Sequence, residues 1–232
     1  MDKSLFKNEI HQLNDGIFEV VNLTQGNYDG QAAKYDNLTS SAVYNRIMWG
    51  NSPKNYARFC QQGLQEHNGG IIADIGCGTL SFTSEVYAKK RPENLFLCDW
   101  SYDMLKVGKE RLEPEIEGAE AITFLRADAL DMPFNDRSIH SLFCFGFIHI
   151  LEKPYLLAKE LYRILHPDGK LYLTSLCNDR KLSSGYLNFL YKKGIVAKPM
   201  HSTDVVKIIK TNGFRLLECR VKGGMAYITA IR

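Results

Sequence analysis

The sequence lacks any apolar run near the roughly 20 residues that a membrane-spanning helix needs. Its start, Met1-Asp2-Lys3-Ser4, also lacks the basic-then-apolar layout of a secretory signal. The six cysteines form no C-x-x-C pair, so we expect no metal site. These absences favour a cytoplasmic protein whose cysteines are mostly small core residues.

The chain has 232 residues, 45% hydrophobic and 24% charged, which suits one α/β domain with a full core and a small appendage. Its net charge of +3 is uneven: residues 181–232 carry ten Lys/Arg and two Asp/Glu, a net of +8, so residues 1–180 sum to −5. A solvated basic face is the simplest explanation. Attraction to an anionic substrate or to nucleic acid is the sharper one.

A short apolar stretch followed by glycines organises the chain. Residues 71–75 are mostly apolar and predict a buried strand. Gly76 and Gly78 then predict a turn that either brings backbone close to a ligand or is simply tight. Thr79 is a candidate cap for a helix running to about Lys90. At the carboxyl end of a parallel strand, such a turn is where open α/β folds bind ligands.

Strand and helix patterns alternate after this turn. Strands are expected at 94–99, 121–126, 138–147, 170–176, 214–221 and 225–231, and helices at 53–65, 101–112, 154–165 and 202–211. The alternation predicts a doubly wound parallel sheet with helices on both faces. The turn Lys222-Gly223-Gly224 between the last two strands predicts a hairpin, and hence one antiparallel strand.

The N-terminal part shows no clear strand pattern. Its apolar residues between 5 and 18 are loosely helix-spaced, and Tyr28, Tyr35 and Tyr44 add aromatic character. We therefore expect residues 1–68 to form an N-terminal lid and helix, and residues 69–232 to form the core.

Three carboxylates stand at or beside the ends of predicted strands. They are Asp74, Asp99 and Asp128. Because the carboxyl ends of parallel strands share one edge, these acids are expected to converge on one crevice. Asp99, about two dozen residues after the glycine turn, is placed to accept from both ribose hydroxyls of an adenosine.

Four motifs in register resemble the class I S-adenosylmethionine-dependent methyltransferases, in particular the small-molecule subgroup that includes ubiquinone/menaquinone-biosynthesis enzymes. The motifs are Asp74-Ile-Gly76-Cys-Gly78-Thr79, Cys98-Asp99-Trp100-Ser101 with Met104, Ala127-Asp128-Ala129 with Met132-Pro133-Phe134, and residues 161–171 (LYRILHPDGKL). The resemblance covers about residues 33–176. It implies a Rossmann-like seven-stranded sheet whose last strand is antiparallel, under an N-terminal helical and aromatic lid.

The resemblance also implies roles at the methionine end of S-adenosyl-L-methionine. Gly76 and Gly78 would let the backbone pass against this part, and Asp74 would face its amino group. Tyr35 would be the lid tyrosine that touches the methionine moiety.

At the adenosine end, Asp99 would hold the ribose hydroxyls, and Trp100 and Met104 would flank the adenine. Asp128 would accept from the adenine amino group, with the Ala129 amide beside it. From the residues alone, the alternative and less favoured role of Asp128 is to cap a short turn over 129–131. Trp100 and Met104 are equally suited to the core.

The resemblance implies methyl transfer to a small-molecule acceptor, mainly through proximity and alignment. His149, after the fourth strand, is a candidate general base or a hydrogen-bonded structural histidine. One alternative is an NAD(P)-dependent oxidoreductase, although Ser81 stands where G-x-G-x-x-G has its last glycine. A non-catalytic S-adenosylmethionine-binding protein is another. The fourth strand lacks the Asn/Asp-Pro-Pro-aromatic motif of amino-adenine methylases, which argues against a nucleic-acid substrate.

Overall fold

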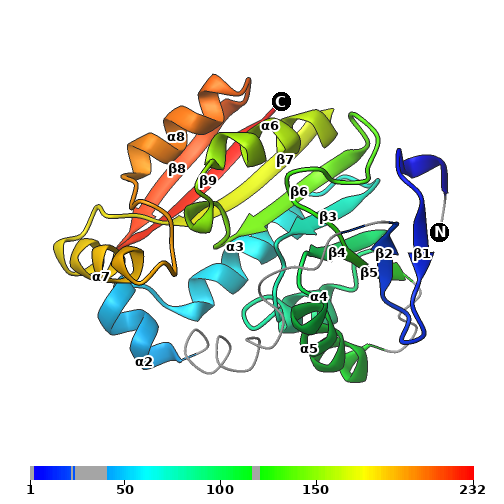
Figure 1. Cartoon of the computed structure of the whole chain (residues 1–232), viewed down its shortest axis with the longest axis horizontal. Helices are drawn as coiled ribbons and strands as arrows, with labels where there is room; N and C mark the ends of the chain where they lie inside the picture. The colour runs from blue at the N-terminus through cyan, green and yellow to red at the C-terminus, as the bar shows by residue number, and fades with distance from the viewer. Residues whose placement is uncertain (1–2, 22, 24–40, 117–120) are drawn as a thin grey trace.

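The computed structural model describes residues 3–21, 23, 41–116 and 121–232. Within these ranges, a nine-stranded sheet forms the middle layer and helices cover both of its faces (Figure 1). No helix in the described ranges has the length and apolar character needed to cross a membrane.

The sheet is parallel in its centre and antiparallel near both edges. Its strands are β1 (Ile10–Gln12), β2 (Phe18–Val20), β3 (Ile72–Ile75), β4 (Leu95–Asp99), β5 (Ile122–Arg126), β6 (Ile139–Phe145), β7 (Leu165–Leu176), β8 (Arg215–Lys222) and β9 (Met225–Ile231). Their order is β1-β2-β5-β4-β3-β6-β7-β9-β8. From β3 the chain moves out to β5 and then crosses back to β6, which confirms the doubly wound arrangement.

The prediction of seven strands is wrong, because the N-terminal segment adds two strands at one edge. β1 pairs antiparallel with β2, and β2 pairs parallel with β5. Phe18 packs on one face of the sheet, whereas Ile17 is fully buried on the other. Two three-residue strands show too little alternation to be recognised locally. In addition, β5, with which β2 pairs, lies about a hundred residues away in the sequence.

The C-terminal hairpin is confirmed. Gly223 and Gly224 join β8 to β9, and Lys222 pairs with Met225 across the turn. Gly223 has a φ of 63°, the left-handed conformation that a tight hairpin requires. β9 lies antiparallel between β7 and β8, so the last strand has the predicted direction.

Two serines cap helices in the structure, whereas the predicted cap Thr79 does not. The helices are α2 (Ala42–Tyr44), α3 (Pro53–Gln65), α4 (Ser84–Lys90), α5 (Tyr102–Leu112), α6 (Pro154–Ile164), α7 (Lys181–Lys192) and α8 (Ser202–Thr211), with a π-helical turn η2 (Asn45–Trp49) and 3-10 turns η1 (Lys3–Leu5), η3 (Glu113–Glu115) and η5 (Ile148–Ile150). Ser52 caps α3 and Ser101 caps α5 through their side chains. Thr79 does not cap α4, since Leu80 has a positive φ of 57° and the helix begins only at Ser84.

Different helices cover each face of the sheet. α3, α4 and α5 pack on one face, around Tyr87 and Phe143, and α6 and α8 pack on the other, around Leu161 and Val205. α2 and η2 lie beside α7. The sequence pattern did not predict α7. The division into residues 1–68 and 69–232, and the lid, stay predictions, because 22 and 24–40 lie outside the described residues.

Candidate functional site

A glycine turn follows β3 and meets the end of β4. The amides of Gly76 and Cys77 both donate to the carbonyl oxygen of Cys98, at 2.8 and 3.0 Å. Gly76 and Gly78 have φ angles of 71° and 56°, which disfavour any residue with a side chain. The turn lies where the strand order reverses, the usual ligand-binding position of open α/β sheets.

The two glycines border different surroundings. A Cβ at Gly76 would lie 2.7 Å from Cγ of Phe147, so this glycine lets the Phe147 ring pack against the turn. A Cβ at Gly78 would have no heavy atom of the described residues within 4 Å. Gly78 therefore offers a backbone that a ligand can approach closely.

Asp99 ties the glycine turn to the start of α5. One carboxylate oxygen accepts from the amide of Gly78 at 2.9 Å, and the other accepts from the amide of Ser101 at 2.9 Å. These two bonds fix the carboxylate at the carboxyl end of β4. The sequence predicted this position for Asp99 but not its hydrogen bond to the turn.

Asp74 is a buried carboxylate beneath the same turn, with only 1% of its surface exposed. Its Oδ2 accepts from the hydroxyl of Tyr87 at 2.8 Å, while Oδ1 is buried with no hydrogen-bond partner among the described residues. Burial raises the pKa of the Asp74 carboxyl to about 7; the Tyr87 hydrogen bond opposes this rise and the charge of Asp99 adds to it. A buried acceptor without a partner is costly, so a cationic ligand group would be stabilised here.

Asp128 lies two residues past the end of β5, the strand that neighbours β4 and its Asp99. Asp99 pairs in register with Arg126, two residues before Asp128. Oδ1 of Asp128 accepts from the amide of Leu130 at 2.8 Å, so the turn-capping interaction is present. This bond is compatible with ligand binding, because a carboxylate offers about four acceptor positions. The next residue, Ala129, is 9% exposed.

Trp100 and Met104 follow Asp99 along the chain. Met104 lies in the first turn of α5 and is 8% exposed. Trp100 is half-buried, and its carbonyl accepts from Nε of Arg126 at 3.0 Å. Arg126 also forms an ion pair with Glu19 of β2, so the added edge strand stabilises the end of β5. The adenine contacts of Trp100 and Met104 stay predictions.

Comparison with known proteins shows which family of proteins this arrangement resembles. Residues 73–173 match the family model described as "Methyltransferase domain". Over these residues the chain is therefore similar to methyltransferase domains. The matched segment begins just before Asp74 and runs through Asp99 and Asp128 into β7.

The domain's relatives include quinone-pathway enzymes. It is 31% identical over 147 residues to "Demethylmenaquinone methyltransferase" of Paenarthrobacter aurescens, covering 63% of this chain and 52% of that protein. It is 26% identical over 167 residues to "Ubiquinone/menaquinone biosynthesis C-methyltransferase UbiE" of Geotalea daltonii, covering 71% and 67%. The chain thus spans about half to two thirds of these relatives.

A solved structure shares the fold. Geranyl diphosphate C-methyltransferase from Streptomyces coelicolor, solved in complex with S-adenosyl-L-homocysteine, has a TM-score of 0.59 and 13% identity, with 74% of each chain covered. At this identity the likeness concerns the fold alone.

His149 lies in η5, after β6, and is 9% exposed. Its Nδ1 lies 3.4 Å from the amide nitrogen of Leu176, which donates to it. Burial lowers the pKa of His149 to about 4, so the ring is neutral at neutral pH. With Nδ1 accepting, the ring proton sits on Nε2. The predicted base role would require the opposite tautomer.

The predicted lid tyrosines are only partly covered by the structure. Tyr28 and Tyr35 lie outside the described residues. The hydroxyl of Tyr44, at the end of α2, donates to the hydroxyl of Tyr186 on α7 at 3.1 Å. The role of Tyr35 at the methionine moiety stays a prediction.

Two aromatic residues of the site escaped the sequence reasoning. Tyr87, on α4, holds Asp74. Tyr56, on α3, stacks on Phe82 with ring centroids 4.8 Å apart, and its hydroxyl lies 3.6 Å from where a Cβ of Gly146 would stand. Both read as ordinary helix-core residues in the sequence, since only the tertiary packing brings them to the ends of β3 and β6.

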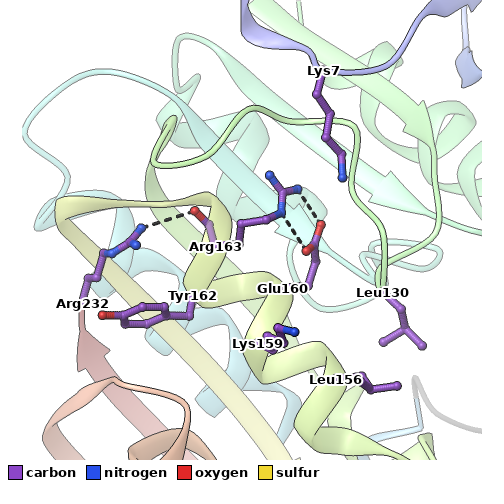
Figure 2. A pocket seen from close by; sticks show the side chains of 8 residues that line it. All are labelled: Lys7, Leu130, Leu156, Lys159, Glu160, Tyr162, Arg163 and Arg232. Carbon is purple, nitrogen blue, oxygen red and sulfur yellow. Dashed lines mark hydrogen bonds and ion pairs between the residues drawn. The ribbon is translucent and has the colours of Figure 1, made fainter.

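A hollow of about 540 Å³ lies at α6, away from the glycine turn (Figure 2). It is lined by Lys7, Leu130, Leu156, Lys159, Glu160, Tyr162, Arg163 and Arg232. Its centre is a paired network: Arg163 binds both carboxylate oxygens of Glu160, and Glu160 accepts from the amide of Met132. The network fixes the segment after Asp128 and is structural.

Proposed function

We propose that this protein is a methyltransferase that uses S-adenosyl-L-methionine to methylate a small-molecule acceptor. The observation that carries the proposal is the buried carboxylate of Asp74, whose Oδ1 has no partner among the described residues beside an open glycine turn. An isolated structural carboxylate would be unfavourable there. A cationic ligand group beside Asp74 would supply the missing hydrogen-bond partner and compensate the buried charge.

The residues around the turn fit the proposed cofactor. S-adenosylmethionine carries an ammonium, a sulfonium and hydroxyls but no phosphate, and the domain offers carboxylates at this edge rather than a phosphate-binding lysine. Asp74 would accept from the ammonium, and Gly78 would leave room for the methionine part. Asp99, already fixed by two amides, would present a pre-oriented carboxylate to the ribose hydroxyls.

The adenine would be held at the next strand. We assign the flanking contacts to Trp100 and Met104, and the hydrogen bonds of the amino group to Asp128 with the Ala129 amide. The bond from the Leu130 amide orients the Asp128 carboxylate in advance. This pre-orientation reduces the entropy lost when the ligand binds.

When bound, S-adenosylmethionine supplies a methyl group on a cationic sulfur. The chain's task is then to align an acceptor atom with that group and to exclude water. Phe147, packed on Gly76, and the stacked pair Tyr56 and Phe82 supply apolar walls near the turn. Tyr35 and the predicted N-terminal lid would complete the enclosure.

The acceptor class follows from the names of the relatives, one of which is a C-methyltransferase of quinone biosynthesis. We propose a small aromatic or quinol-like acceptor. An aromatic carbon that gains a methyl group must lose a proton, so a base is required in that case. His149 is the candidate; to act as the base through Nε2, its ring would have to carry the proton on Nδ1 and give up the hydrogen bond from the Leu176 amide.

Calorimetric titration with S-adenosylhomocysteine tests the cofactor proposal. Asp99→Asn should bind at least tenfold more weakly than the parent, since a charged hydrogen bond contributes about 1.5–3 kcal/mol. Asp168→Asn, which changes an exposed carboxylate at the start of β7, is the matched control and should bind as the parent does. No binding by the parent, or equal binding by Asp99→Asn, would refute the assignment.

A turnover assay separates an enzyme from a non-catalytic binder. Methyl-labelled S-adenosylmethionine is incubated with a chemically reduced short-chain demethylmenaquinone, and the organic phase is counted. Label in that phase, lost in Asp99→Asn, supports the proposed reaction. Cofactor binding without any transfer to quinol acceptors would favour the binder.

A further inference from the structure

Large apolar side chains are exposed mainly at one end of the molecule. Six of the eleven such residues in the described ranges lie in α2, η2, α7 and the turn after it: Val43, Ile47, Leu182, Phe189, Tyr191 and Ile195. Figure 1 shows α7 and α2 together at this end. Ser183 of α7 joins them by donating to the Met48 carbonyl at 2.9 Å. A concentration of this kind marks an interaction surface.

α7 has a buried stripe and a separate exposed stripe. Ser183, Leu187 and Leu190 face the protein. Leu182 and Phe189, seven residues apart and so on one side of the helix, are 47% and 52% exposed. The exposed side therefore carries apolar groups of which about half the surface faces solvent, even though the Phe189 ring also stacks on Tyr186 with centroids 6.1 Å apart.

Cations surround this stripe and carboxylates are absent from its chain segments. The exposed lysines are Lys181, Lys192, Lys193 and Lys198. Residues 180–203 and 41–65 contain no Asp or Glu. The ammonium of Lys193 lies 5.9 Å from the centroid of the Phe189 ring, so charge and apolar surface are interleaved.

We propose that this surface, the α7 face (Leu182, Phe189, Lys192, Lys193 and Ile195), docks the protein on a bilayer that contains anionic lipid. A helix with exposed Phe and Leu beside lysines is suited to lie in the interface, with its apolar groups among the headgroups. The lysines complement the negative surface potential of anionic lipids. A neutral protein partner would leave these charges without a complement.

The α7 face also lies near the edge of the sheet that carries the site. β7 ends at Leu176, and Leu176 packs in one cluster with Trp49, Tyr186 and Ile150. A docked molecule would therefore hold the carboxyl end of β7 close to the lipid headgroups. The docking itself does not depend on methyl transfer, and it is measured without cofactor or acceptor.

Co-sedimentation with large vesicles tests the proposal. The full-length protein is mixed with vesicles of phosphatidylcholine alone or of phosphatidylcholine with phosphatidylglycerol. We expect binding to the second kind, weakened by salt. Lys192→Gln with Lys193→Gln should reduce it about 30-fold, at about 1 kcal/mol per lysine. Phe189→Ser should reduce it about tenfold through lost apolar burial.

The matched control is Lys207→Gln with Lys210→Gln, which removes two exposed lysines from α8 and should leave binding within about twofold of the parent. Circular dichroism checks that each variant is folded. Three results would overturn the proposal: no binding to either vesicle, equal binding to both, or an equal loss in the control variant.

Discussion

Replacing Asp74 by Asn should stabilise the protein at alkaline pH while weakening the site. The buried carboxyl has a pKa raised by burial from its ordinary 3.8 to about 7. A group whose pKa is higher in the folded state contributes stability below the unfolded pKa and loses it as the pH rises through the folded value. The parent should therefore lose stability between about pH 4 and pH 7, relative to a variant that cannot ionise at this position.

The structure sets the size of this effect. A rise of about three pH units at about 1.36 kcal/mol each corresponds to about 4 kcal/mol over the full range. The Asn amide group would itself lack a partner where Oδ1 now lies, which costs about 1–3 kcal/mol. The net gain near pH 8 should then be about 1–3 kcal/mol.

Chemical denaturation at several pH values between 5 and 8 measures the free energy of unfolding of both proteins. The stability difference should grow from pH 5 to about pH 7 in favour of Asp74→Asn and then level off, whereas Asp168→Asn should run parallel to the parent. At pH 8 the affinity of Asp74→Asn for S-adenosylhomocysteine should fall at least tenfold through loss of the charged contact. A stability difference that is constant across pH would show that Asp74 does not titrate in this range and would refute the reasoning.

Three further predictions concern the scaffold around the site. Arg163→Met should destabilise the fold by about 3 kcal/mol or more, because it leaves Glu160 buried without its partner, and denaturation curves that match the parent would contradict this. Burial lowers the pKa of His67 and of His140, so the unfolded chain takes up protons on these residues more readily than the folded protein does. The free energy of unfolding should therefore fall as the pH drops below about 6.5. His67→Gln should make this fall shallower, which melting temperatures measured against pH would show. Ser101→Ala should cost about 1 kcal/mol through loss of the α5 cap, and an unchanged denaturation midpoint would argue against the capping bond.

The order of the strands from β3 to β9 followed from local pattern, whereas α7, which lies between β7 and β8, was not predicted. The apolar runs and the Gly223-Gly224 turn each indicate their structure within a few residues, and both predictions were confirmed. The two added strands β1 and β2 were missed, because their hydrogen bonds depend on an edge supplied by β5. The start of α4 was misplaced, because the positive φ of Leu80 has no sequence signal.

The sequence by itself determined the glycine turn and the positions of three acids at the ends of adjacent parallel strands, since strand ends and turn residues are local properties. Only the tertiary structure decided the state of those acids. It gave Asp74 a tyrosine partner and a buried oxygen with no partner among the described residues, and it tied Asp99 to the glycine turn. The physical reason is that burial and hydrogen-bond partners come from segments distant in the chain, and these set the charge, orientation and pKa of a side chain whose identity the sequence alone supplies.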